Sequence, residues 1–262
     1  MLNKISLSLL FVFFSSFSLL AQSSNKKVRV LSFNIYHGAT MNNDFNLDYI
    51  AKIISTSEPD FVCLQEVDFK TKRSHGLDIA TELGQRTKLA PLFGKAMDFD
   101  GGAYGVGILS KYPILSSTVV NLPYSENKEP RVALAIQSQL PSGDTLTVIS
   151  THLDHLEDDS DRIKQVNMLN STFLSSPFPI VLAGDLNDTP HSPSINLIEK
   201  YWQPSYTKHS PAPTYPSDAP EKKIDYVLSA PQGSWIVRSS EVIDDSMASD
   251  HCAYLVELEL IE

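Results

Sequence analysis

The stretch from Pro179 to Asp188, PIVLAGDLND, is the most informative part of the sequence, because an apolar run is followed there directly by polar residues. The run from Ile180 to Ala183 has the composition of a buried strand. A glycine follows, and then come Asp185, Asn187 and Asp188. Polar groups at the end of a buried strand lie at the rim of a sheet, where a cleft can form.

The same pattern of a buried strand flanked by polar residues recurs along the chain. Five further apolar runs are typical of buried strands: Val28 to Phe33, Phe61 to Leu64, Thr145 to Ser150, Ile224 to Leu228 and Cys252 to Leu258. The polar residues at their ends are Asn34, Glu66, His152, Asp225, Asp250 and His251. We therefore expect these side chains to meet at one common rim.

The segments between these strands predict the layers around them. Apolar residues at helical spacing indicate helices near residues 47–54 and 163–173. The middle of the chain indicates antiparallel strands at Tyr104 to Ser110, Ile114 to Asn121 and Arg131 to Leu140. Mixed strands with helices outside predict an α+β fold in which two sheets pack face to face. The proline-rich segment from His209 to Lys223 is the one we expect to be mobile.

The N-terminus predicts export. Lys4 precedes an apolar run from Ile5 to Leu20 that ends at Ala21, as in a secretory signal peptide, and the serines within it disfavour a membrane span. We expect residues 1–21 to be removed and residues 22–262 to form one catalytic domain, without a stable membrane anchor and as a monomer. We expect the mature protein to be periplasmic or extracellular.

The net charge bears on the class of substrate, and the two cysteines bear on whether the chain forms a disulfide. The chain has 262 residues and a formal net charge of −10 at pH 7, which disfavours nucleic acid as the substrate without excluding it. Cys63 and Cys252 both lie in apolar runs, so we favour buried free thiols, although an exported protein also permits a disulfide between them.

Carboxylates, amides and imidazoles at one rim suit a single chemistry, the attack of water on a phosphate held by a hard divalent cation. Mg²⁺ prefers oxygen ligands, with Mn²⁺ as an alternative, and Glu66 fits that role, completed by Asn34 or Asp250. His251 is the candidate base, since its ordinary pKa is near working pH, and Asp225 is the candidate group that orients it.

The remaining polar residues are candidates for holding the substrate. Asp185 would position the attacking water or assist the leaving oxygen, and Asn187 and His152 would donate hydrogen bonds to the phosphate. Arg73 and Arg131 could reach a phosphate or a cleft carboxylate, although a solvated surface role fits each as well. Tyr104 fits either the cleft wall or the core of a strand.

Seven fragments in order carry a resemblance: LSFNIYHG, LQEV, YGVGILSKYPI, ISTHLDH, LAGDLND, IDYVL and SDHCAYLVEL. Together they resemble the endonuclease/exonuclease/phosphatase superfamily, the DNase I-like metal-dependent phosphoesterases. The resemblance implies a four-layer α/β/β/α sandwich and Mg²⁺-dependent cleavage of a phosphoester. It also implies site roles for Asn34, Glu66, His152, Asp185, Asn187, Asp225, Asp250 and His251. Each residue alone also fits a turn or a strand end, but the ordered set favours the functional interpretation.

The sequence leaves three functions open. The first is an exported hydrolase of a phosphodiester or phosphomonoester, on a small substrate or a lipid or sugar headgroup. The second is a secreted DNase I-like nuclease, and the third is a metal-dependent module that binds a phosphate ligand without turnover. Fold and motif do not separate them, because loops choose the substrate.

Overall fold

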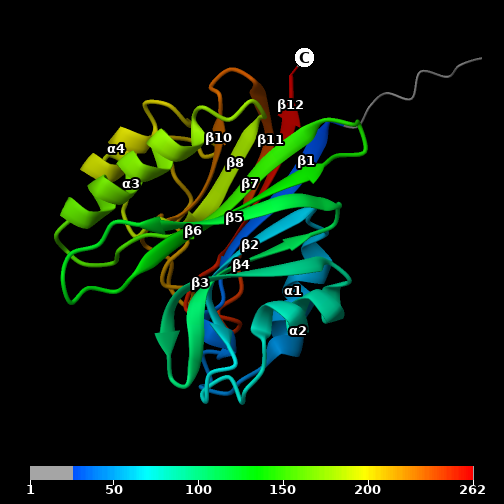
Figure 1. Ribbon diagram of the computed structural model, residues 1–262, viewed down its shortest axis with the longest axis vertical. Coiled ribbons are helices and arrows are strands. Elements are labelled where there is room, and N and C mark those ends of the chain that lie inside the picture. The colour runs from blue at the N-terminus through cyan, green and yellow to red at the C-terminus, as the bar shows by residue number, and fades with distance from the viewer. Residues whose placement is uncertain (1–25, 262) are drawn as a thin grey trace, which may run out of the picture.

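The computed structural model describes residues 26–261, and it contains two six-stranded sheets packed against each other (Figure 1). The first sheet has the order β11-β12-β1-β2-β4-β3. Its strands are β1 (Lys27–Asn34), β2 (Phe61–Phe69), β3 (Ala90–Phe99), β4 (Gly102–Ser110), β11 (Trp235–Ile243) and β12 (Ala253–Leu260).

The second sheet has the order β5-β6-β7-β8-β10-β9. Its strands are β5 (Ile114–Leu122), β6 (Arg131–Gln139), β7 (Thr145–His152), β8 (Ile180–Asp185), β9 (Gln203–Pro204) and β10 (Asp225–Ala230). The helices are η1 (Tyr36–Gly38), α1 (Leu47–Ser57), α2 (Ile79–Thr87), α3 (Ser160–Phe173) and α4 (Pro193–Ile198).

Three hydrophobic cores separate four layers. Val30 and Val106 of the first sheet meet Val148 and Val181 of the second in the core between the sheets. A second core lies between the first sheet and helices α1 and α2, and a third lies between the second sheet and helices α3 and α4. Alternate residues of a strand face opposite sides, so both sheets bury both faces. The predicted α/β/β/α sandwich is confirmed.

Each sheet contains one parallel pair, and these two pairs position the site. Asn34 ends β1 beside Gln65 of the parallel strand β2. His152 ends β7 beside Asp185, which ends the parallel strand β8. Gly184 permits this last pairing, because a Cβ there would lie 2.1 Å from the backbone oxygen of Thr151. The polar residues after the strands therefore gather at the same end of the sandwich.

Several secondary-structure elements have no clear signal in the sequence. Strands β3 and β11 form the two opposite edges of the first sheet. Both are mostly half-buried or exposed, so neither has the continuous apolar run of a buried strand. Helix α2 is short, and its N-terminus is capped by Asp78, which accepts a hydrogen bond from the backbone N–H of Thr81.

The segment expected to be mobile is packed in its middle part. Thr214 and Ser217 are buried, and the backbone N–H groups of Thr214 and Tyr215 donate to the carbonyl of Lys222. This part forms a strap beside the polar end of the sandwich, defined here as residues 214–217.

Other expectations concern the termini and the thiols. The predicted signal peptide, residues 1–21, lies outside the described residues. Among residues 26–261, no helix is long and apolar enough to cross a membrane. Cys63 and Cys252 are both buried and free, so they form no disulfide with each other.

Candidate active site

A cleft of about 740 Å³ opens at the polar end of the sandwich, and nine of the predicted site residues line it. The first sheet and the loop after β2 supply Glu66, Arg73 and Tyr104. The second sheet and the loop after β8 supply Arg131, His152, Asp185 and Asn187, and the loop before β12 supplies Asp250 and His251. The two remaining predicted residues, Asn34 and Asp225, are fully buried beside this cleft.

Asp185 lies at the centre of the site. One carboxylate oxygen, Oδ1, accepts a hydrogen bond of 2.9 Å from the backbone N–H of Asn187. The other, Oδ2, accepts one of 3.1 Å from the side-chain amide of Asn34, which joins the two sheets. The same oxygen lies 3.4 Å from Nε2 of His152 and 3.6 Å from Nε2 of His251. A single carboxylate therefore touches four of the predicted residues.

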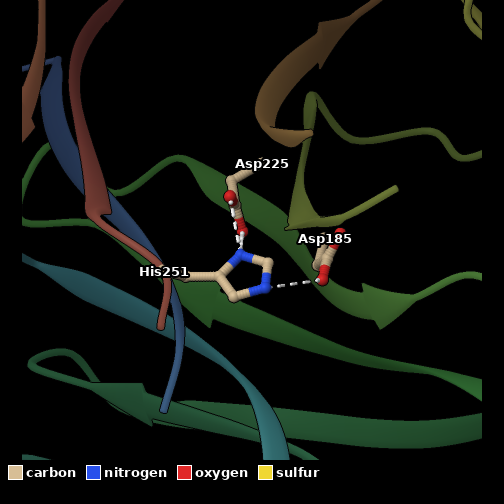
Figure 2. A group of neighbouring side chains, drawn as sticks. All are labelled: Asp185, Asp225 and His251. Atoms are coloured by element: carbon tan, nitrogen blue, oxygen red, sulfur yellow. Dashed lines mark hydrogen bonds and ion pairs between the residues drawn. The ribbon is translucent and has the colours of Figure 1, made fainter. Parts of the chain in front are cut away.

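His251 is held by Asp225 and faces Asp185, as Figure 2 shows. Its Nδ1 lies 3.0 Å from Oδ2 of Asp225, which leaves Nε2 directed toward Asp185 and the cleft. Against the effect of burial, the charges of Asp225 and Asp185 raise the pKa of His251. Burial raises the pKa of the Asp185 carboxyl, and the nearby Asp225 adds to this. The proton affinities of Asp185 and His251 are therefore linked through the charges that these groups place on each other.

The strap fixes the loop that carries His251. Ser217 donates a side-chain hydrogen bond of 2.6 Å to the carbonyl of Ser249, and its backbone N–H donates to the carbonyl of Asp250. Thr214 Oγ1 accepts from the backbone N–H of Asp225 at 3.2 Å. The ring of Tyr215 lies 4.8 Å from that of His251, measured between centroids. The strap thus positions both members of the Asp225–His251 pair.

Glu66 sits on an irregularity of strand β2. The pairing of β2 with β4 shifts register between Leu64 and Val67, and Glu66 has a left-handed φ of 55°. Such a bulge re-aims a side chain, and backbone strain of this kind is concentrated at functional sites. Burial opposes ionisation of Glu66, but the Asn34 amide at 3.2 Å and the nearby imidazole of His37 hold its pKa below the ordinary value. Glu66 is therefore an ionised carboxylate.

His152 and Asn187 face the cleft from the second sheet. Nε2 of His152 lies 2.9 Å from the side-chain nitrogen of Asn187, which also donates to the carbonyl of Leu153. Arg131, only 4% exposed, donates from Nη1 to Nδ1 of His152 at 3.2 Å. Burial and the charge of Arg131 lower the pKa of His152 well below its ordinary value. His152 is therefore a neutral imidazole.

Arg73 and Tyr104 form the opposite wall. The guanidinium of Arg73 makes two hydrogen bonds to Asp68, of 2.7 and 2.8 Å. Tyr104 is 7% exposed, and burial raises the pKa of its hydroxyl well above the ordinary value. Both arginines of the predicted set thus lie in the cleft wall rather than on the open surface.

The site offers oxygen and imidazole groups that suit a cation. Asp185, Asp225 and His251 present atoms that all lie within 4.8 Å of one another. The facing atoms of Asp225 and His251 already bond to each other. Glu66 and Asp250 instead line the open cleft, and burial raises the pKa of Asp250, with Glu66 adding to the rise. An ionised Glu66 beside Asp250, whose proton affinity it raises, is a donor set that a divalent ion matches.

Several residues of the site escaped the sequence analysis. His155 lines the cleft, with its Nδ1 3.1 Å from Nη2 of Arg131. Asp68 is fully buried and holds Arg73, and its position two residues after Glu66 in a strand was the available signal. The strap had no sequence signal beyond its prolines, because its role depends on contacts with distant segments.

Lys223 is the least expected residue near the site. It is 3% exposed, and its Nζ has no hydrogen-bond partner within the described part of the chain. The ammonium lies 3.1 Å from the ring centroid of Tyr254 and 5.4 Å from that of Tyr226. Burial lowers the pKa of Lys223 to about 7, although Asp225 opposes the shift.

We expect Lys223→Met to remove a pH dependence of stability. An unfolded lysine keeps its proton to about pH 10.4. The folded one releases its proton near pH 7. Between these values the unfolded state binds more protons, so Lys223 makes wild-type stability rise with pH, by about 1 kcal/mol per unit.

Urea unfolding of wild type and Lys223→Met at pH 7 and pH 9 measures this difference. The variant is expected to be the more stable protein at pH 7, with the gap narrowing at pH 9. The exposed neighbour Lys222 provides the matched control, Lys222→Met. Stability curves that run parallel for wild type and Lys223→Met would show that the buried lysine keeps its ordinary pKa.

Fold and site together define a class: a four-layer α/β/β/α sandwich with carboxylates and imidazoles in a cleft at one end of its sheets. The family model described as Endonuclease/Exonuclease/phosphatase family matches residues 31–251. The chain belongs to the endonuclease/exonuclease/phosphatase family. Members of this family are generally phosphoester hydrolases and typically depend on a divalent metal.

Solved structures agree on the fold. An endonuclease/exonuclease/phosphatase from Beutenbergia cavernae superposes with a TM-score of 0.73 and 24% identity, covering 90% of this chain and 72% of that one. A second one, from Bacteroides vulgatus, superposes with a TM-score of 0.73 and 21% identity, covering 89% of this chain and 99% of that one. A mannosyl-6-phosphatase from Bacteroides thetaiotaomicron superposes with a TM-score of 0.71 and 16% identity, covering 88% of this chain and 99% of that one. No curated protein matches the chain.

Proposed function

We propose that this protein is an exported hydrolase that cleaves a phosphoester by attack of water. The observation that carries the proposal is the chain of contacts from Asp225 through His251 to Asp185, which opens into a cleft where Glu66 is ionised. A general base, a group that orients it and an anionic oxygen ligand are the parts that such a reaction requires.

The residues of the cleft fit a divalent cation. Glu66 and Asp250 would hold Mg²⁺ or Mn²⁺ through carboxylate oxygens, with Asn34 beside them at 3.2 Å from Glu66. When bound, such an ion offsets the charge of the phosphate and lowers the proton affinity of the neighbouring imidazole.

The protein's own groups then move the protons. His251, oriented through Nδ1 by Asp225, accepts a proton from the attacking water at Nε2, and Asp185 positions that water and shares the proton. Asn187 donates a hydrogen bond to the phosphate, and the neutral His152 beside it donates another. The water oxygen bonds to phosphorus and the bond from phosphorus to the ester oxygen breaks. The leaving alkoxide takes up a proton from solvent, and His251 returns the proton it accepted to solvent.

Two features support a small substrate over a long nucleic acid. The net charge of −10 repels polyanions, and a cleft of about 740 Å³ is the size of a small-molecule site. One solved structure with a similar fold is named a mannosyl-6-phosphatase, which supports a phosphomonoester as the small substrate. The predicted signal peptide, residues 1–21, supports action in the periplasm or outside the cell.

Hydrolysis of p-nitrophenyl phosphate and bis-p-nitrophenyl phosphate by the chain from residue 22 tests this function. We expect turnover in Mg²⁺ or Mn²⁺ and a loss of at least about 100-fold in EDTA, since the ion supplies several kcal/mol of charge stabilisation. Preferential cleavage of DNA would instead support the nuclease. Binding of phosphate compounds without any turnover would support the non-catalytic module and contradict the proposal.

A further inference from the structure

One wall of the cleft is built by the hairpin of β3 and β4. The pairing of these strands shifts register between Lys95 and Met97, after Ala96 has packed against the core between the sheets. A bulge reverses which residues face a given side of a strand. Met97 and Phe99 consequently line the cleft together with Tyr104. This wall is apolar and aromatic, in contrast to the charged end at His251.

Arg73 is fixed against the same wall. Asp68, fully buried, receives hydrogen bonds from Nε and Nη2 of Arg73, and the guanidinium lies 4.6 Å from the ring centroid of Phe99 and 5.8 Å from that of Tyr104. The backbone N–H of Arg73 donates to Asp100 at 2.9 Å. Its Nη1 group has no hydrogen-bond partner among residues 26–261, and one third of the side chain is exposed. Arg73 thus lines the cleft as a donor whose position is fixed by Asp68.

The charges of the wall arginines are already compensated. Arg73 is paired with Asp68, and Arg131 lies 2.8 Å from a carboxylate oxygen of Glu129. The cleft also contains the carboxylate of Asp188 and the exposed Lys222. A second phosphate or a nucleic-acid backbone would be favoured by uncompensated positive charge on these walls. The walls therefore suit a neutral group beside one phosphate.

We propose that Arg73, Met97, Phe99 and Tyr104 bind the alcohol part of the substrate, and that this part is a neutral hydroxylated ring, such as a sugar, carrying a single phosphate. The inference rests on the proposed function and names its substrate class. Met97 and Phe99 pack against the carbon face of the ring, and Arg73 donates to its hydroxyl groups. A few fixed polar groups on an apolar wall are what orient a small ligand.

Kinetics with two phosphomonoesters test the proposal. Glucose 6-phosphate carries the hydroxylated ring, and ethyl phosphate lacks it. We expect wild type to prefer glucose 6-phosphate. Arg73→Met and Phe99→Ala are each expected to raise its KM about tenfold, the loss typical of a hydrogen bond to a charged group or of an apolar contact. The selectivity for glucose 6-phosphate over ethyl phosphate, measured as the ratio of their kcat/KM values, is therefore expected to fall about tenfold in each variant. A loss shared by both esters would report an indirect effect, such as that of the Arg73 charge on Glu66.

Matched controls separate a binding role from a structural one. Arg86→Met removes an exposed arginine of α2 that pairs with Asp48 and Glu82 outside the cleft, and it is expected to leave both KM values unchanged. If Arg73→Met reduced kcat/KM equally for both esters, Arg73 would have only a structural role, and the proposal would be overturned. Equal use of both esters by wild type, or a preference for single-stranded DNA, would also overturn it.

Binding provides a readout that separates this inference from the proposed function. Calorimetric titration with glucose 6-phosphate in Mg²⁺ uses the His251→Ala background, in which turnover is lost. It is expected to show binding that the added change Arg73→Met weakens about tenfold. Binding without hydrolysis of any ester would contradict the proposed function and leave this site in place. Hydrolysis of ethyl phosphate without binding of glucose 6-phosphate would contradict only the ring site.

Discussion

His251→Ala is expected to reduce turnover of a phosphoester about 1,000-fold, the middle of the range for loss of a positioned acid or base. The size of the effect follows from the geometry, since no other imidazole in residues 26–261 is held at Nδ1 by a carboxylate while its Nε2 faces Asp185. His152 does not replace it, because the pKa of that imidazole is lowered and its Nδ1 is occupied by Arg131.

The measurement is kcat with bis-p-nitrophenyl phosphate or p-nitrophenyl phosphate, whichever wild type prefers, in saturating Mg²⁺. Circular dichroism and the melting temperature verify that the variant is folded. His209→Ala, at an exposed histidine on the connection after β9, is the matched control and is expected to retain wild-type turnover. A variant at His251 that keeps more than about a tenth of wild-type activity would remove this residue from the role of base.

Glu66→Gln is expected to weaken Mg²⁺ binding by more than about tenfold, because an amide keeps the shape of the side chain but lacks the charge that attracts a hard cation. The low pKa of Glu66 makes this carboxylate anionic throughout the neutral range. Metal stabilises the folded state by mass action, so a tenfold weaker site loses about 1.4 kcal/mol of the stabilisation that saturating Mg²⁺ gives.

Melting temperature as a function of Mg²⁺ concentration measures this effect without any substrate. Glu129→Gln is the matched control, since Glu129 lines the same cleft but pairs with Arg131. The control is expected to follow the wild-type titration. An unchanged titration in Glu66→Gln would place the ion elsewhere, and the group of Asp185, Asp225 and His251 would then be the site to change.

Much of the fold could be predicted from local sequence. Buried strands such as β8 have continuous apolar runs, and the polar residues after them mark the end of the sheet. Edge strands β3 and β11 could not be found in this way, because a half-exposed strand needs no apolar run. The bulge at Met97 that forms one cleft wall depends on pairing with β4, and nothing within β3 itself signals it.

The sequence predicted which types of residue form the site, but only the tertiary structure shows how they contact one another. The ordered motifs identify Asn34, Asp185 and His251, but they do not show that the amide of Asn34 joins the two sheets through Asp185. Nor do they show that Nε2 of His251 lies 3.6 Å from Asp185, because this distance joins segments 66 residues apart in numbering.

Hydrophobic pattern and residue chemistry are local properties, so the sequence alone indicated two packed sheets with helices outside and the types of group available for catalysis. Its ordered motifs added the resemblance to the family, and through it the four-layer α/β/β/α sandwich. The tertiary structure decided which groups are ionised, which arginines are compensated, and that Lys223 is buried between two tyrosines. Charge states and donor directions depend on burial and on neighbours from distant segments, and only the packing of the two sheets creates those neighbours.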